Sequence, residues 1–226
     1  MISKGIQFWY LYSALVALVL IRIIPFVYPD SRTWGFNHLI FLPSDYSVLF
    51  FCLAIVALLL PFVKKSEIWG GEFVDWFSNI FFESPRKYIY RVVLILSITA
   101  LFIIFSAKTH FLGDGYEVIN NISSGDGSFF KWSALGITFL LKILNQVLGA
   151  DGNQTAILAI QIVSYLSGIL SIWFYFLIAE YISEIKVQRI IMFLVLLFSG
   201  SLLLLFGYAE NYPSLLIAVS GMIYGG

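Results

Sequence analysis

Charged residues are scarce in this chain, since Asp, Glu, Lys and Arg make up only 12% of its 226 residues. Soluble globular proteins carry about twice that share. Acidic and basic residues number 13 each, so the net charge is zero and nothing in it favours nucleic acid as a partner. The single cysteine, Cys52, excludes an intrachain disulfide, and the scattered histidines and cysteine form no zinc-type ligand pattern.

Hydrophobic residues are abundant instead, at 60% of the chain, and the mean hydropathy is +0.93. We therefore expect an all-α, multi-pass membrane protein with membrane lipids around it, built as a polytopic transmembrane helical bundle with interfacial amphipathic helices. The first run lacks a cleavage site and predicts a retained signal anchor. The last run is too short to cross, so we expect either a longer protein or an incomplete last helix. About six spans are predicted, at 7–28, 46–63, 88–106, 155–179, 190–207 and from 214 onward.

Segment 132–150 has two readings, because its length allows a crossing but one helical face is polar. Thr138, Lys142 and Asn145 lie on that face with Gln146 and Gly149, and leucines occupy the other. This pattern favours a helix lying along the membrane surface. If it does not cross, eight of the 13 basic residues are cytoplasmic, in agreement with the positive-inside rule. They are Lys4, Lys64, Lys65, Arg86, Lys87, Arg91, Lys186 and Arg189.

The region 64–87 predicts a second interfacial helix, with apolar residues at helical spacing between basic clusters. We divide the chain accordingly into a transmembrane hairpin with this helix, 1–87, and a transmembrane core, 88–226. Arg22 and Arg91 fall inside or near the edge of apolar runs, and we expect both to extend toward an interface.

The first polar segment, 109–121, follows a span directly and contains Gly113-Asp114-Gly115. The flanking glycines leave the carboxylate of Asp114 open to a ligand or metal. The alternative is helix capping, in which Asp114 and Glu117 form a capping box at the start of a short helix. His110 suits phosphate binding or proton transfer, although a lone loop histidine often does neither.

The second polar segment, 206–213, separates two later apolar runs and reads Phe206-Gly-Tyr-Ala-Glu-Asn-Tyr-Pro213. Tyr208 and Tyr212 fit an aromatic belt at the membrane interface. Glu210 and Asn211 have no such explanation, because a junction at lipid level needs neither. Function therefore depends on whether Asp114 and Glu210 share one side of the membrane.

These two segments, in this order, resemble the GT-C superfamily of membrane glycosyltransferases, which includes protein O-mannosyltransferases and aminoarabinose-transferase-like enzymes. Phe111-Leu-Gly-Asp-Gly-Tyr116 is similar to the family's first external loop, which carries an essential acid after a transmembrane helix. Segment 132–150 resembles the juxtamembrane helix that follows this loop. The resemblance covers residues 88–226, although in many members the loop acids are adjacent rather than separated as here.

The resemblance implies transfer of a sugar from a polyprenyl-phosphate donor to an acceptor at the external face of a bacterial inner membrane, in the cell envelope. It implies Asp114 as general base or metal-linked carboxylate, with Glu117 as the second catalytic acid; the cofactor is unknown, and a divalent metal fits. Expected substrate-binding residues are Lys108, His110, Tyr208, Glu210 and Asn211. The alternative is a non-catalytic membrane protein, either a transporter subunit or a lipid-binding or structural partner.

Overall fold

The computed structural model of the chain describes residues 4–28, 44–63, 65–107, 115–124, 135–150, 152–207, 209 and 212–226. All regular elements in these ranges are helical, which confirms the predicted all-α class. Four helical segments are long and apolar enough to cross a membrane, as expected of a helical membrane protein. They are Phe8–Val27, Ser44–Phe62, Lys87–Ile104 and Asn153–Ile182. The chain forms two compact units, Met1–Glu72 and Phe73–Gly226.

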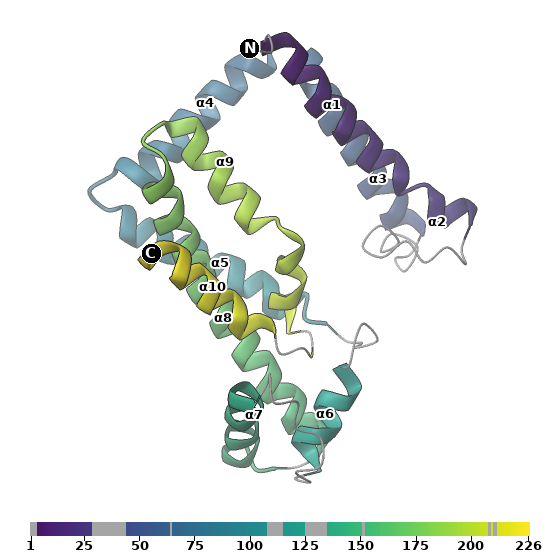
Figure 1. Cartoon of the computed structure of the whole chain (residues 1–226), viewed down its shortest axis with the longest axis vertical. Helices are drawn as coiled ribbons and strands as arrows, with labels where there is room; N and C mark the ends of the chain where they lie inside the picture. Colours follow the sequence, from purple (N-terminus) through teal and green to yellow (C-terminus); the bar gives the residue numbers. More distant parts are fainter. Residues whose placement is uncertain are drawn as a thin grey trace. The chain divides into compact units, whose positions relative to one another are not determined.

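The first unit is a helical hairpin. Helix α1 (Lys4–Ile21) continues into the short α2 (Ile24–Val27), and α3 (Ser44–Leu59) ends in the 3₁₀ turn η2 (Leu60–Phe62). Figure 1 shows α1 and α3 side by side. They are antiparallel, because Tyr12 near the start of α1 contacts Phe62 at 5.2 Å between ring centroids. Both helices expose apolar side chains on nearly all faces, as helices in contact with lipid do.

Helix α4 (Ser66–Ser78) confirms the helix expected in region 64–87, and a π-helical turn, η3 (Asn79–Glu83), follows it. Sequence gave no signal for the π turn. Phe77 and Phe81 are buried, and their rings lie 5.8 Å from Phe193 and 6.0 Å from Phe176 respectively. Interval 73–87, which we grouped with the N-terminal part, therefore packs within the second unit.

The second unit is a bundle around α8 (Asn153–Ile182). This helix contacts α5 (Lys87–Ile104), α9 (Lys186–Leu197) and α10 (Tyr212–Gly225), as Figure 1 shows. Phe176 of α8 stacks on Phe193 of α9 with 4.2 Å between ring centroids. Gly168 lets α5 approach closely, because a Cβ there would lie 2.9 Å from the Phe102 ring.

Helices α5 and α8 are antiparallel, which defines two ends of this bundle. At the basic end, Lys87 at the start of α5 pairs with Glu180 near the end of α8. At the loop end, Ser106 just after α5 accepts a hydrogen bond from Gln161 in the first part of α8. Chain segment 107–152 thus leaves and re-enters the bundle at the same end.

Helices α6 (Gly115–Ser123) and α7 (Leu135–Val147) both pack at the loop end. Helix α7 has 13 residues and so covers about 20 Å, short of the roughly 30 Å hydrocarbon core. This agrees with the expectation that segment 132–150 does not cross. Its polar face is not wholly exposed, however: Asn145 is buried and donates a hydrogen bond from Nδ2 to the carbonyl oxygen of Ile122, 3.2 Å away.

The expected span 190–207 is interrupted in the structure. Helix α9 ends at Leu197, Ser199 is extended with ψ 161°, and a 3₁₀ helix, η6 (Gly200–Phe206), follows. Ser and Gly favour the α-helix less than the neighbouring leucines, so Ser199-Gly200-Ser201 is where the helix breaks. Hydropathy alone could not separate this arrangement from one continuous helix.

Candidate functional site

Most of the side chains expected to form the site lie outside the described residues. They are Lys108, His110, Asp114, Tyr208, Glu210 and Asn211. Glu117 is described, and so are the residues that flank both polar segments. These flanking residues show how the two segments are attached to the bundle.

Glu117 lies in the first turn of α6 and is exposed to solvent. A carboxylate in this position interacts favourably with the helix dipole, so Glu117 fits the capping role as well as a catalytic one. Gly115 and Ile119, on either side of it, are buried. Helix α6 is thus anchored through its apolar face while Glu117 points away from the bundle.

The chain segments that lead into the two polar segments are directly bonded to each other. The backbone amide of Ala107 donates a hydrogen bond to the carbonyl oxygen of Phe206 at 2.8 Å. Ala107 immediately precedes Lys108, and Phe206 is two residues before Tyr208. Both polar segments consequently start from one point at the loop end.

Gly207 allows this close approach. Its φ is +74°, in the left-handed region that favours glycine. A Cβ at this position would lie 2.8 Å from Cγ of Gln161 and 3.2 Å from Oγ of Ser106. Nε2 of Gln161 in turn donates a 2.8 Å hydrogen bond to Oγ of Ser106, which ties α8 to the end of α5.

A second buried cluster continues this contact toward α6 and α7. We call it the loop-end cluster. It consists of Ile119, Ile122, Leu141, Ala156, Ala159, Ile160 and Ala209. Ala209 is fully buried and belongs to the second polar segment, whereas Ile119 belongs to the first. The described parts of both segments therefore lie at the same end of the bundle.

Asn145 joins α7 to this cluster. Its bond to Ile122 satisfies a carbonyl at the C-terminal end of α6, where no intrahelical donor remains. We placed Asn145 on the polar face of this helix and expected that face to contact lipid headgroups. At Asn145 the face contacts the protein instead. The physical reason is that α6 offers a carbonyl oxygen there for the amide to bond.

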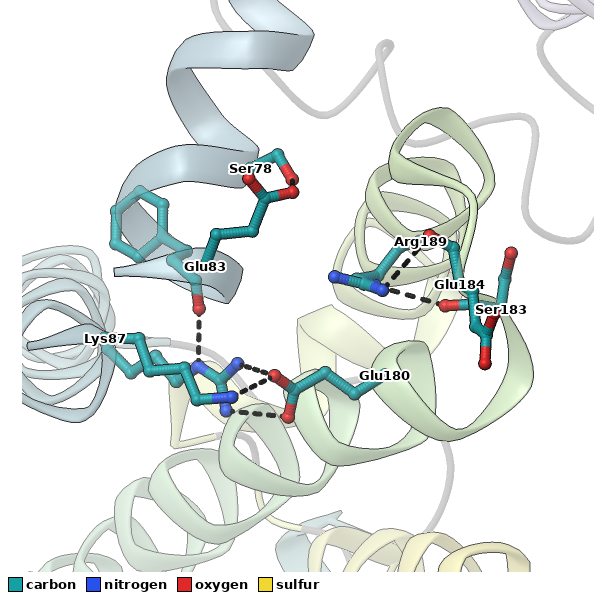
Figure 2. Close-up of polar contacts among 9 residues, drawn as sticks. Ser78, Glu83, Lys87, Glu180, Ser183, Glu184 and Arg189 are labelled. Atoms are coloured by element: carbon teal, nitrogen blue, oxygen red, sulfur yellow. Dashed lines mark hydrogen bonds and ion pairs between the residues drawn. The ribbon is translucent and has the colours of Figure 1, made fainter. Parts of the chain in front are cut away.

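The basic end holds a buried ion-pair cluster that sequence reasoning missed (Figure 2). Arg91 is completely buried and binds Glu180 through two bonds, from Nη1 to Oε2 at 3.2 Å and from Nη2 to Oε1 at 2.6 Å. Its Nε donates to the carbonyl oxygen of Phe81 at 2.8 Å, and Lys87 also reaches Glu180. The expectation that Arg91 extends to the interface was wrong, because an acid on α8 and a carbonyl of the π turn bind it within the protein.

Neighbouring charges at this end are also paired. Nζ of Lys186 lies 3.3 Å from Asp75 and 3.4 Å from Glu83. Figure 2 shows Arg189, which donates to the carbonyl oxygens of Ser183 and Glu184. Each of these cations already has protein partners. The sequence carried two signals for this cluster: a lone acid at the end of one apolar run, and basic residues at the start of another.

These charged side chains of the basic end are therefore bound to one another and to backbone carbonyl oxygens within the protein. Among the described residues, no group of three His, Cys, Asp or Glu side chains is arranged to hold a metal ion. Asp114, the residue expected to bind a metal, lies outside that set. Comparison with family models, curated proteins and solved structures finds no match for this chain.

Proposed function

We propose that this chain is part of a GT-C-type glycosyltransferase that acts on a polyprenyl-phosphate-linked sugar at the external face of a bacterial inner membrane. The observation that carries the proposal is the hydrogen bond between Ala107 and Phe206, which brings the bases of both polar segments together. A site that needs acids from both segments requires this arrangement.

The packing around that bond supports the same function. Glu117 extends from α6, and Ala209 is buried in the cluster that also anchors α6. In sequence, Asp114 adjoins Gly115, the buried first residue of α6, and Glu210 adjoins Ala209. In the proposed mechanism Asp114 takes the proton from an acceptor hydroxyl, which contributes about 10²–10⁴-fold to the rate. The departing lipid phosphate is stabilised by hydrogen-bond donors and cations.

The alternative, a transporter subunit or lipid-binding partner, has one observation in its favour. The break between α9 and η6 resembles the discontinuous helices of transporters, which bind substrate at such breaks. Transporters also place ionisable groups near the middle of the membrane. In the described part of the second unit, the charged residues within long helices lie near helix ends, as Lys87, Arg91 and Glu180 do. This distribution favours the enzyme.

The test is turnover of the donor. Membranes containing the full-length protein are incubated with a panel of polyprenyl-phosphate sugars, and released polyprenyl phosphate is measured by mass spectrometry. We expect release with at least one donor and a loss of about 10²-fold or more in Asp114→Asn. Glu184→Gln, an exposed acid at the basic end, is the matched control and should retain activity. Release that is unchanged in Asp114→Asn would contradict the proposed mechanism.

A further inference from the structure

Arg86 is an exposed cation at the basic end of the bundle. It comes directly before α5, and its guanidinium forms no hydrogen bond or ion pair with the described residues. The acid nearest to it in the sequence, Glu83, is engaged elsewhere, because it accepts a hydrogen bond from Ser78 and pairs with Lys186. The charge of Arg86 is therefore available to a partner outside the chain.

Lys87, the next residue, is only partly neutralised. Its Nζ lies 2.7 Å from Oε1 of Glu180 (Figure 2). Nη2 of Arg91 contacts the same oxygen at 2.6 Å, so one carboxylate serves two cations and the group of three carries a net positive charge. Arg91 also binds Oε2, so Glu180 keeps a cation when Lys87 turns toward another anion. The Lys87 side chain is 25% exposed and can make that turn.

The start of α5 lies at a membrane boundary. Its 18 residues cover about 27 Å, close to the roughly 30 Å thickness of the hydrocarbon core. Tyr88 stacks on Trp173 of α8 with 6.1 Å between ring centroids, and Nζ of Lys87 lies 5.4 Å from the Tyr88 centroid. Tyrosine and tryptophan concentrate at the level of the lipid headgroups. Both cations are consequently at headgroup level.

Arg86 continues a face of α5 that is open to lipid. Ile89, Tyr90 and Val93 follow it by three, four and seven residues, which places them on its side of the helix. Their side chains are 61%, 39% and 56% exposed, whereas Ile95, nearly opposite Val93, is 3% exposed. An acyl chain along this face therefore has its headgroup within reach of the guanidinium.

We propose that Arg86 and Lys87 bind the phosphate of an anionic phospholipid in the leaflet at the basic end, with an acyl chain of this lipid along Ile89, Tyr90 and Val93. A guanidinium offers paired donors to phosphate oxygens, and hydrogen bonds between charged groups are stronger than neutral ones. A zwitterionic headgroup carries its own cation, so the net positive charge here favours an anionic lipid. This site does not depend on the proposed enzymatic activity, which concerns the loop end.

The test is lipid binding to the full chain in detergent. The protein is titrated with phosphatidylglycerol or phosphatidylcholine, and bound lipids are counted by native mass spectrometry. We expect the natural chain to prefer phosphatidylglycerol, and Arg86→Gln to reduce this preference about fivefold, as expected for one cation near an anionic lipid surface. Adding Lys87→Gln should reduce it further. Arg86→Lys keeps the charge and should keep most of the preference.

Lys65→Gln is the matched control, since it removes the same charge from another exposed position and should leave the preference unchanged. Thermal unfolding in detergent without phospholipid should be the same for Arg86→Gln and the natural chain. If Arg86→Gln unfolds earlier, the folded Arg86→Lys variant decides, because loss of the preference there would contradict a role of the charge.

Three results would overturn the site. They are no preference in the natural chain, an unchanged preference in Arg86→Gln, and an equal decrease in Lys65→Gln, which would indicate general attraction between the chain and anionic lipid. Glycerol 3-phosphate, a soluble analogue of the headgroup, should not compete at the same concentration as the lipid. Competition by it would overturn the lipid as the source of the phosphate.

Discussion

Ala107 and Phe206 are joined by a 2.8 Å hydrogen bond from amide to carbonyl, although they lie far apart in the sequence. Ala107 comes after α5 and Phe206 ends η6, so this bond closes the loop end of the bundle. It also fixes where both polar segments begin. The spatial relation between the two segments, on which the proposed function depends, thus follows from one backbone contact and the side chains packed around it.

This contact predicts a disulfide. In a chain with Cys52→Ser, the pair Ala107→Cys and Phe206→Cys should oxidise readily, because residues joined by such a backbone bond have Cα atoms within the roughly 7 Å that a disulfide tolerates. The control pair is Ala107→Cys with Glu184→Cys at the opposite end, which should stay reduced. The measurement is the change in electrophoretic mobility after protease cleavage between the two positions. Equal oxidation of both pairs would contradict the arrangement.

Gly207→Ala should destabilise the bundle. The new Cβ would lie 2.8 Å from Cγ of Gln161, and alanine at φ +74° costs about 1 kcal/mol before any clash. We expect a total loss of about 2 kcal/mol, since a crowded core adds at least a further 1 kcal/mol.

Gly136→Ala is the matched control for this substitution. Gly136 is an exposed residue of α7, and a Cβ there would meet nothing within 4 Å. Alanine favours the helix over glycine, so this variant should be as stable as the natural chain or slightly more so. Thermal unfolding in detergent compares the two. Unfolding of both variants at the same temperature would contradict the close packing around Gly207.

Glu180→Ala should be strongly destabilising, because it leaves the guanidinium of Arg91 buried without its carboxylate. Removing one partner of a buried ion pair typically lowers the free energy of unfolding by about 3–5 kcal/mol. Because Glu180 is partly exposed, we expect a loss of about 3 kcal/mol. Arg91→Lys should not replace the arginine, because an ammonium cannot form the two bonds to Glu180 and the third to Phe81 together. Glu184→Ala is the exposed control, and denaturant unfolding is the measurement. A small effect of Glu180→Ala would mean that the pair does not form.

The pairing of Lys186 should respond to alkaline pH. Its hydrogen bond to Asp75, together with Glu83, raises the pKa of Lys186 above the ordinary 10.5. Because the pKa of Lys186 is higher in the folded than in the unfolded protein, its pairing stabilises the folded protein fully at pH values below the unfolded-state pKa. This stabilisation is lost as the pH rises through the folded-state pKa. The difference in unfolding temperature between the natural chain and Lys186→Met should therefore be constant from pH 7 to 9 and shrink above about pH 10.5. A difference that persists at higher pH would show that lost packing causes it.

The helical class and the four long apolar helices were predictable, because apolar run length alone distinguishes a membrane helix. The pairing of Arg91 with Glu180 was not, since hydropathy shows that each residue is unusual but does not indicate which helices are neighbours. The only sequence signal for the helix break at Ser199 was a weak helix propensity. The surrounding run is so apolar that hydropathy predicts one continuous helix there. For the candidate site, sequence selected two polar segments, while the contacts of Ala107 and Gly207 needed three-dimensional structure.

Cysteine labelling in intact membranes tests the central claim, that both polar segments share one side, most directly. Single cysteines are placed at exposed positions in a Cys52→Ser background: Ser124 after α6, Tyr212 at the start of α10 and Glu184 at the basic end. We predict that a membrane-impermeant maleimide applied from outside labels positions 124 and 212 and leaves 184 unlabelled until the membrane is opened. Labelling of 124 and 212 from opposite sides would contradict the shared site and with it the proposed glycosyltransferase.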